Sequence, residues 1–273
     1  MRKTLLATLG AVVMSFLAGT SAHADQLSDI KTKGTLVCGT LGTAEPFSFP
    51  NPQTREIQGY DVDFCNAIAK SLGVKPELKL ISVAARIPEL QQGRVDLLVA
   101  NLGWTPERAQ QIVYSDSYYA SLQKVAAKAS QGFKTLDDLE GKRVSAPKGS
   151  TSEAAVKSRL PSARVITFQD PPAAFLAMQQ GKVEGFAVSE IMLMKFKKQV
   201  ESSSPIAILE PALMTEAWGV GMKKGETALI DQVNSTLQAM EKSGEAQQIF
   251  DKWLGEETSY GLQRGFTIAP IKG

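Results

Sequence analysis

Short apolar runs alternate with amphipathic stretches through the first part of the chain. The apolar runs predict strands at 34–39, 75–83 and 95–99, and the amphipathic stretches predict helices at 61–72, 87–92 and 106–112. In the first of these helices Phe64, Ile68 and Leu72 fall on one stripe, and Gly73 ends it. Strands that alternate with helices in this way indicate a parallel sheet with right-handed crossovers.

A second alternation begins after residue 122. Strands are expected at 122–128, 143–146, 163–168, 183–188, 207–209 and 218–222, and helices after Thr135 and Ser150 and at 172–180, 191–198, 228–242 and around 249–253. Two such units, joined near 120–125 and again near 215–220, predict an α/β protein of two lobes. The expected division places 25–120 and 220–273 in lobe 1 and 125–215 in lobe 2. Two strand crossings between the lobes make a cleft that can close by hinging.

The first 24 residues have the pattern of a cleavable signal peptide. Arg2 and Lys3 form a positive start, residues 5–18 are mostly apolar, and Ala22-His23-Ala24 is a small-x-small cleavage site. The apolar run is too short for a stable membrane span. We therefore expect an exported, soluble, periplasmic protein whose folded part begins at Asp25.

Removal of this segment restricts the chemistry that remains. The full chain has 30 Lys+Arg and 28 Asp+Glu, so the loss of Arg2 and Lys3 leaves it near neutral, without the basic field of a nucleic-acid-binding protein. The one histidine, His23, is also lost. Ser-His-Asp, Cys-His and histidine-ligated metal sites are thereby excluded, and we expect neither a metal nor a cofactor.

The two cysteines are Cys38, in the first expected strand, and Cys65, in the helix that follows. In an oxidising compartment a disulfide between them is the first expectation. A strand and its following helix are packed neighbours, which favours this pairing. A pair of buried free thiols is the alternative.

The stretch 99–108 is the first candidate site. Asn101 and Gly103 interrupt the chain after a buried strand, and Thr105-Pro106 reads as an N-cap followed by proline at the first helical position. Open α/β folds bind small molecules at this edge of the sheet. Arg108 offers a bidentate fork to a carboxylate there. The alternative is a helix arginine in a surface ion pair.

The stretch 147–153 is the second candidate site. A strand leads through a glycine turn to a helix N-terminus, which favours an anion. Ser150 with Glu153 predicts a capping box, and Ser150 and Thr151 add hydroxyl donors. If the lobes face each other, this helix start lies across the cleft from Arg108. Plain capping is the alternative interpretation.

Three further residues are candidates for contact with a ligand. Arg86 lies between a strand and its helix at the same sheet edge, where it would neutralise a second acidic group. A solvated arginine at a helix start is the alternative. Trp104 and Tyr60 are placed to sandwich an apolar portion of a ligand, with a role in the core or between the lobes as the alternative.

Several motifs occur in a fixed order along the chain. They include GYDVDFCNAIAKSLGV (59–74), RIPELQQGRVDLLVA (86–100), TPER (105–108), LDDLEGKRV (136–144), KGSTSE (148–153) and EKSGEAQQIFDKWLG (241–255). Together they resemble the polar amino-acid-binding class of periplasmic solute-binding proteins of ABC transporters (bacterial extracellular solute-binding protein family 3). The resemblance covers nearly the whole chain after residue 24.

This resemblance implies a two-lobed, double-hinged fold that closes on an amino acid and delivers it to a membrane permease. It implies that the C-terminal helices return to the first lobe. Arg108 and Thr151 would bind the α-carboxylate of the ligand, with Tyr60 and Asn101 in the cleft. Cys38 and Cys65 look like the cysteine pair of a general amino-acid-binding subgroup. We expect a monomer with a small-molecule ligand.

The chain departs from the family pattern at three places. Gly103 stands where the family often has threonine or serine, and an aromatic residue common near Ala44 is absent. Ser189, followed by Glu190, aligns with the family aspartate that holds the ligand ammonium group. The carboxylate half of the pocket is thus expected to be intact and the amine half altered.

Three explanations of the altered amine half remain open. Glu190 replaces the aspartate, a backbone carbonyl does so, or the ligand is not a standard α-amino acid. Arg86 resembles an arginine of acidic-amino-acid binders, which favours an acidic ligand. The alternative function is a dehydratase-like enzyme on the same scaffold, for which Glu190 is the one acid that the sequence nominates.

Overall fold

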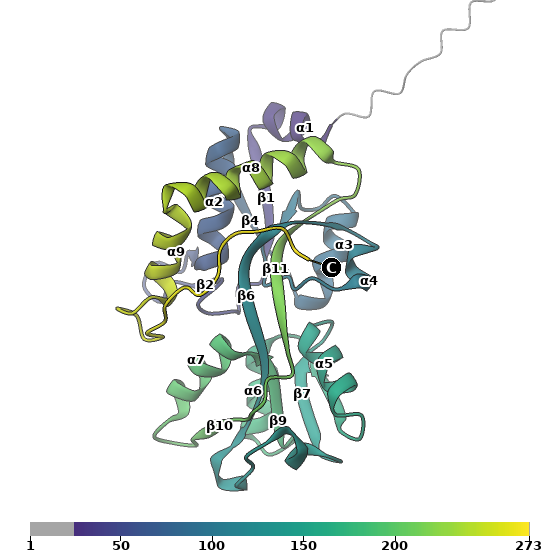
Figure 1. Cartoon of the computed structure of the whole chain (residues 1–273), viewed down its shortest axis with the longest axis vertical. Coiled ribbons are helices and arrows are strands. Elements are labelled where there is room, and N and C mark those ends of the chain that lie inside the picture. Colours follow the sequence, from purple (N-terminus) through teal and green to yellow (C-terminus); the bar gives the residue numbers. More distant parts are fainter. Residues whose placement is uncertain (1–24, 273) are drawn as a thin grey trace, which may run out of the picture.

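The computed structural model describes residues 25–272, so the expected signal peptide lies outside the described residues. The chain forms two lobes that lie one above the other along the long axis (Figure 1). Two long strands, β6 (Val113–Lys128) and β11 (Met214–Met222), run between the lobes. Within 25–272, no helix has the length and apolar character needed to cross a membrane.

The first lobe is built on a short parallel sheet. β1 (Thr35–Thr40) pairs in parallel with β4 (Lys75–Leu80) on one side and with β5 (Leu97–Leu98) on the other. The helices α1 (Gln26–Lys33), α2 (Tyr60–Leu72), α3 (Arg86–Gln91) and α4 (Pro106–Ala109) and the small hairpin of β2 (Phe49–Pro50) and β3 (Ile57–Gln58) complete this part. The parallel arrangement expected from the alternation of strands and helices is confirmed.

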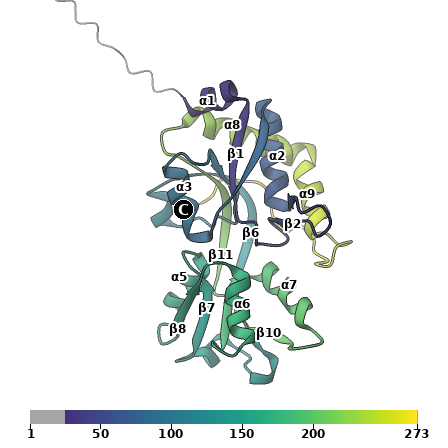
Figure 2. The same cartoon turned by 180° about the vertical axis from the view of Figure 1, so that it is seen from behind.

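The second lobe repeats this plan. β7 (Arg143–Pro147) pairs in parallel with β8 (Arg164–Phe168) and with β9 (Gly185–Ser189). The helices are α5 (Thr151–Arg159), α6 (Pro171–Gln179) and α7 (Glu190–Val200), and β10 (Ile206–Ile208) adds an antiparallel edge to β6. The view from behind shows α2 beside β1 in the upper lobe and α6 over the strands of the lower lobe (Figure 2).

One sheet runs through both lobes in the order β4-β1-β5-β11-β6-β9-β7-β8. At its centre β6 and β11 pair antiparallel, with Ser121 opposite Glu216 and Ala120 opposite Ala217. Both strands are longer than expected. Residues 113–121 pair with residues 216–222, and residues 214–217 pair with residues 120–123, so the pairing continues across the middle of the molecule. The two crossings therefore form a single two-stranded connection.

The C-terminal helices lie on the first lobe. α8 (Thr227–Ser243) contacts α1, α2 and β6, and α9 (Glu245–Leu254) packs on α2 and α8. The upper position of both helices is visible in Figure 1. The chain after α9 stays with this lobe as well, since the Ser117 N–H donates to the Ala269 carbonyl (2.8 Å). The expected return of the C-terminal helices to the first lobe is confirmed.

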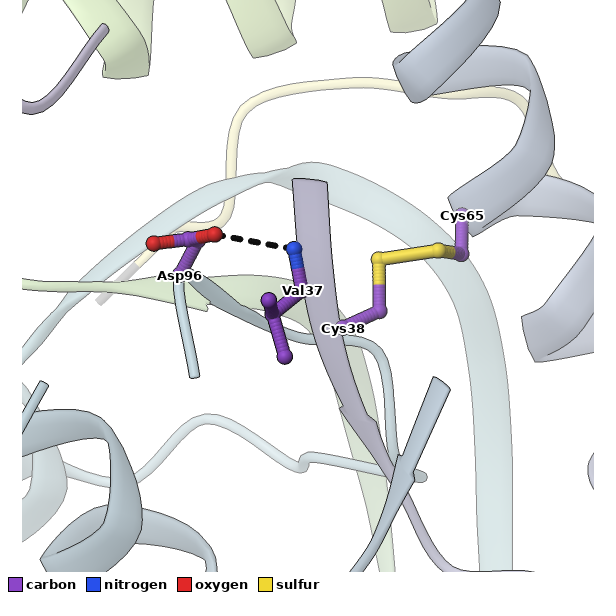
Figure 3. The surroundings of a disulfide bond; sticks show 4 residues. All are labelled: Val37, Cys38, Cys65 and Asp96. Carbon is purple, nitrogen blue, oxygen red and sulfur yellow. Dashed lines mark hydrogen bonds between the residues drawn. A yellow bond between two sulfur atoms is a disulfide. The ribbon is translucent and has the colours of Figure 1, made fainter. Parts of the chain in front are cut away.

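A disulfide fastens β1 to α2. Cys38 and Cys65 are both buried and are joined, with their Cα atoms 6.4 Å apart (Figure 3). The expected disulfide is therefore present, and the alternative of two free thiols is wrong. On the other side of β1, the Asp96 carboxylate accepts a 2.8 Å hydrogen bond from the Val37 N–H, which fixes the start of β5 beside β1.

Several local expectations differ from the structure. The strand expected at 75–83 ends at Leu80. The strand expected at 95–99 is reduced to Leu97–Leu98, and the helix expected at 106–112 ends at Ala109. The helix α1 was not expected at all. Of its residues only Ile30 is buried, so the segment shows no apolar stripe, and its ends are set by the Asp25 N-cap and by Gly34 with a positive φ of 70°.

Candidate functional site

A small cavity lies between the lobes. The candidate residues that line it are Arg86, Asn101, Ser150, Thr151 and Ser189, together with the unexpected Gln123, Glu216 and Trp218 and the apolar Leu41, Val83 and Met192. Its volume is about 40 Å³, which is room for roughly three water molecules. The two lobes and both crossing strands all contribute to this one site.

Arg108 reaches from one lobe to the other. It lies in α4, whose N-cap Thr105 accepts a 3.2 Å hydrogen bond from the Arg108 N–H, with Pro106 at the first helical position as expected. Its Nη1 donates to the Gly103 carbonyl (2.7 Å) and its Nη2 to the Gly149 carbonyl (2.9 Å). Arg108 does not itself line the cavity, but its charge acts on the cavity residue Glu216.

The loop before α5 is capped in part as expected. Ser150 accepts a hydrogen bond from the Glu153 N–H (3.1 Å), but the Glu153 carboxylate accepts from the Gly149 N–H (2.8 Å) and not from Ser150. The second half of the expected capping box is therefore wrong, because the Ser150 N–H donates to the Pro147 carbonyl instead. Thr151 follows at the first helical position, buried against the cavity.

Arg86 is a buried cation and not a solvated one, with only 3% of its surface exposed. Its Nε donates to the Val83 carbonyl (2.9 Å), and its Nη1 donates to the carbonyls of Ala100 (2.9 Å) and Asn101 (2.7 Å). Burial lowers the pKa of Arg86 to about 9, and the positive charge of Arg108 adds to this effect. At neutral pH the side chain is still a cation, so Arg86 brings positive charge to the cavity wall.

Asn101 occupies a special backbone position at the end of β5. Its φ is +49°, a left-handed conformation that asparagine tolerates better than most residues. Its N–H donates to the Asp61 carboxylate (2.9 Å), while both atoms of its side-chain amide are buried without a hydrogen-bond partner in the described part of the chain. The Ser189 hydroxyl is unpaired in the same way. Buried polar groups at a cavity that lack a protein partner mark positions where a bound molecule or a water supplies the missing hydrogen bond.

Glu216 is the functional candidate that sequence reasoning missed. It lies on β11 and is 6% exposed, and its Oε1 accepts hydrogen bonds from Gln123 Nε2 (2.8 Å) and Trp218 Nε1 (2.6 Å). Its Oε2 is buried and has no hydrogen-bond partner among residues 25–272. Burial raises the pKa of Glu216, against the opposing effects of the nearby Thr151 hydroxyl, the Trp218 indole and the two arginines.

Gly103 leaves the space that Glu216 fills. A Cβ atom on Gly103 would lie 2.2 Å from Glu216 Oε2, much closer than any allowed contact. The departure from the family pattern at residue 103 thus has a structural explanation. A signal was available in the sequence, because Glu216 is a carboxylate in the expected crossing at 215–220, where a hinge strand passes the cleft.

A hydrogen-bonded chain connects the second lobe with both crossing strands. The Ser152 hydroxyl of α5 donates to the Gln123 side-chain carbonyl on β6 (2.5 Å), and the Gln123 amide in turn donates to Glu216 on β11. All three side chains are buried. The orientation of the Glu216 carboxylate is therefore fixed by groups on three different elements.

Besides Arg108 and Gly103, three further expected site residues do not line the cavity. Tyr60 is fully buried in the core, where its hydroxyl donates to the Tyr118 carbonyl (2.9 Å) and its ring packs on Phe64. The backbone N–H of Trp104 donates to the Ala217 carbonyl (2.9 Å), and the Trp104 side chain does not line the cavity. The aromatic residue in the cavity wall is Trp218.

Glu190 is the third of these residues. Its carboxylate pairs with Lys124 Nζ on β6 at 2.8 Å and does not line the cavity. Because β6 pairs with β9 at Lys124 and Val188, the lysine lies close to the first turn of α7. Glu190 is therefore not the acid of the cleft, and the dehydratase-like alternative loses the acid that the sequence nominated for it.

Comparison with known proteins agrees with this geometry. Residues 36–256 match the model of the bacterial extracellular solute-binding proteins, family 3. The ABC transporter glutamine-binding protein GlnH of Bacillus subtilis is 29% identical over 257 residues, which covers 93% of each chain.

Two solved structures have the same fold. An ancestral arginine-binding protein bound to glutamine is 34% identical, with a TM-score of 0.77 over 82% of this chain and 99% of that one. The ancestral amino acid-binding protein AncCDT-1, a precursor of cyclohexadienyl dehydratase, is 29% identical, with a TM-score of 0.77 over 84% of this chain and 99% of that one. This chain belongs to the bacterial extracellular solute-binding proteins of family 3.

Proposed function

We propose that the protein is the periplasmic substrate-binding component of an ABC importer and captures an amino acid or a related small carboxylate. The observation that carries this proposal is a cavity between two lobes with buried ionisable side chains of both signs, Arg86 and Glu216. It also has polar atoms on Asn101 and Ser189 that lack a partner among the described residues. A small zwitterionic solute complements such a wall, because each of its charges finds an opposite partner.

Closure of the lobes is the proposed capture step. The hinges are placed at about 120–125 and 215–220, where β6 and β11 pair side by side. They divide the described chain into lobe 1, with 25–120 and 220–272, and lobe 2, with 125–215. Closure excludes water from the ligand and brings the start of α5 to Arg108 and Arg86. The closed protein then docks on a membrane permease.

The carboxylate of the ligand is assigned to Arg108 and Thr151. A guanidinium has five N–H donors, and the Arg108 contacts with the Gly103 and Gly149 carbonyls use two of them. The remaining donors leave room for a carboxylate at the start of α5, where the helix N-terminus also favours an anion. Arg86 supplies a second positive charge at the cavity, which favours a solute with a second acidic group.

The test is a ligand screen by thermal shift, followed by calorimetry. L-Glutamine, L-arginine, L-glutamate and glutarate are the probes, and a binding probe raises the melting temperature of the native protein. Arg108→Ala is expected to weaken the best probe by about tenfold or more, the loss of a hydrogen bond to a charged group. The matched control is Arg94→Ala, which removes an exposed arginine paired with Glu89.

The outcomes separate two parts of the proposal. Equal affinity of the Arg108→Ala variant and the wild-type protein for the best probe would remove Arg108 from the carboxylate site. The absence of any melting shift with all four probes would contradict capture of this class of solute. A loss of affinity in Arg94→Ala as large as in Arg108→Ala would show a general effect of arginine removal.

A further inference from the structure

The cavity wall has one carboxylate among the described residues that line it, and that carboxylate belongs to Glu216. Position 189, at the start of α7, offers a hydroxyl group and no charge, and the neighbouring Glu190 pairs with Lys124. Any cationic group of a bound solute therefore finds its anionic partner on the crossing strand β11 and not on α7.

The two oxygens of Glu216 have different surroundings. Oε1 is occupied by the Gln123 amide and the Trp218 indole N–H. Oε2 is buried and accepts no hydrogen bond from residues 25–272, although it lies against the Gly103 backbone. The carboxylate of this cavity-lining residue is thus held by one oxygen, and its other oxygen has no donor among residues 25–272. A buried carboxylate oxygen without a donor is unfavourable, and a donor from a ligand removes this cost.

No cation of the described chain supplies that donor. Glu216 forms no ion pair within residues 25–272. The nearest arginines direct N–H groups to backbone carbonyls instead, Arg108 to Gly103 and Gly149, and Arg86 to Ala100 and Asn101. The negative charge of Glu216 is therefore compensated only from a distance until a cation enters the cavity.

Two more acceptors share the cavity with Oε2. The Asn101 side-chain oxygen and the Ser189 hydroxyl are both buried and have no partner within residues 25–272, and both residues line the same cavity. A primary ammonium group carries three N–H donors, and these three acceptors match that number. They come from the first lobe, the second lobe and the connection between them, so a single ammonium group would join all three.

We infer that Glu216, with Asn101 and Ser189, receives the α-ammonium group of an amino-acid ligand. This inference rests on the proposed function and narrows it, because it makes the solute an amino acid and excludes a simple carboxylic acid. Glu216 thereby discriminates between an amino acid and a molecule of similar size that has the same carboxylate but no α-amino group. Gly103 is needed for this role of Glu216, since a side chain at residue 103 would displace the Glu216 carboxylate from its position.

The test is calorimetry with three matched pairs of probes. Each pair is an amino acid and the same molecule without its α-amino group: L-glutamine with 5-amino-5-oxopentanoate, L-glutamate with glutarate, and L-arginine with 5-guanidinopentanoate. The wild-type protein is expected to bind at least one amino acid about ten- to a hundredfold more tightly than its partner. In Glu216→Gln this preference is expected to disappear, while binding of the partner without the amino group is unchanged.

Glu190→Gln is the matched control, because it removes a neighbouring carboxylate that does not line the cavity. Should Glu216→Gln fail to fold, the comparison of paired probes on the wild-type protein still shows whether the site prefers a solute with an α-amino group. Equal affinity within every pair, or an amino-acid preference retained in Glu216→Gln, would overturn the inference and leave the proposed function standing. Failure of the wild-type protein to bind any of the six probes would contradict the proposed function, and the inference with it.

Discussion

The Arg108 guanidinium donates a 2.9 Å hydrogen bond to the carbonyl oxygen of Gly149, a residue of the opposite lobe. Arg86 directs a weaker contact, at 3.5 Å, to the same oxygen. One carbonyl at the start of α5 thus faces two cations of the first lobe. The closed arrangement has a stabilising contact of its own, in addition to those that a ligand brings.

Removal of this contact is expected to favour the open protein. A hydrogen bond from a charged group contributes about 1.5–3 kcal/mol, so Arg108→Gln would lower the ratio of closed to open molecules by roughly tenfold or more. Small-angle X-ray scattering without ligand measures this as a larger radius of gyration than in the wild-type protein. Arg94→Gln is the control, and scattering curves identical for Arg108→Gln and wild type would contradict the prediction.

Gly103 and Glu216 are expected to be energetically coupled. A Cβ at residue 103 would meet the Glu216 carboxylate, whose other oxygen is held by Gln123 and Trp218. Gly103→Ala is therefore expected to lower the free energy of unfolding by about 1–3 kcal/mol. In the background of Glu216→Ala the same change should cost much less. Urea unfolding of the wild-type protein, the two single variants and the double variant measures this coupling. If Gly103→Ala lowered the free energy of unfolding equally in both backgrounds, the two residues would not be coupled.

Asp61 makes stability depend on pH. It is fully buried at the start of α2 and accepts hydrogen bonds from the Tyr118 hydroxyl and the Asn101 N–H, each at 2.9 Å. Burial raises its pKa from 3.8 to about 7, against the lowering effect of these two bonds. Because the folded pKa is the higher one, the protonated carboxyl stabilises the fold below about pH 4, and this contribution is lost as the pH rises through 7.

The Asp61→Asn variant removes this dependence. Relative to the variant, the free energy of unfolding of the wild-type protein is expected to fall by about 4 kcal/mol between pH 4 and pH 8. Urea titrations across this range measure the difference, and Asp29→Asn, at an exposed position of α1, sets the baseline. A difference between wild type and Asp61→Asn that does not change with pH would refute the prediction.

The disulfide between Cys38 and Cys65 is expected to stabilise the first lobe. Its sequence separation of 27 residues corresponds to a loop-closure contribution of roughly 3–4 kcal/mol. The double variant Cys38→Ser with Cys65→Ser should lose about this much in urea unfolding. Dithiothreitol should lower the stability of the wild-type protein toward that of the variant and leave the variant unchanged. Equal stability of the two proteins without reductant would argue against this contribution.

Much of the fold follows from local patterns. The alternation of apolar strands and amphipathic helices predicts the parallel part of the sheet in each lobe, because each crossover depends on residues close in sequence. The ends of strands also place Arg86, Asn101 and Thr151 at one cleft. The length of β6 was not predictable in this way, since residues 113–121 are held by pairing with residues 216–222 of β11, which lie far away in the sequence.

The site residues that the sequence did not predict are also brought together by contacts between distant parts of the chain. Glu216 faces Gln123 across 93 positions of sequence, and neither residue belongs to a local motif that marks it. Proximity in sequence was misleading for Glu190, which follows the expected ammonium position but pairs with Lys124. For Tyr60 the spacing allowed both a core and a cleft position, and only the packing against Phe64 and Tyr118 distinguishes them.

The central pairing of β6 and β11 has a consequence for the order in which a solute is recognised. Gln123 and Glu216 lie in the strands about which the lobes turn in the proposed mechanism, so rotation of one lobe leaves them nearly in place. The open protein then already presents the carboxylate of Glu216, whereas Arg108 and Thr151 approach each other only on closure. A solute would be held first by the contact of its amine with Glu216 and last by its carboxylate, and a molecule lacking the amine would dissociate before the lobes could shut.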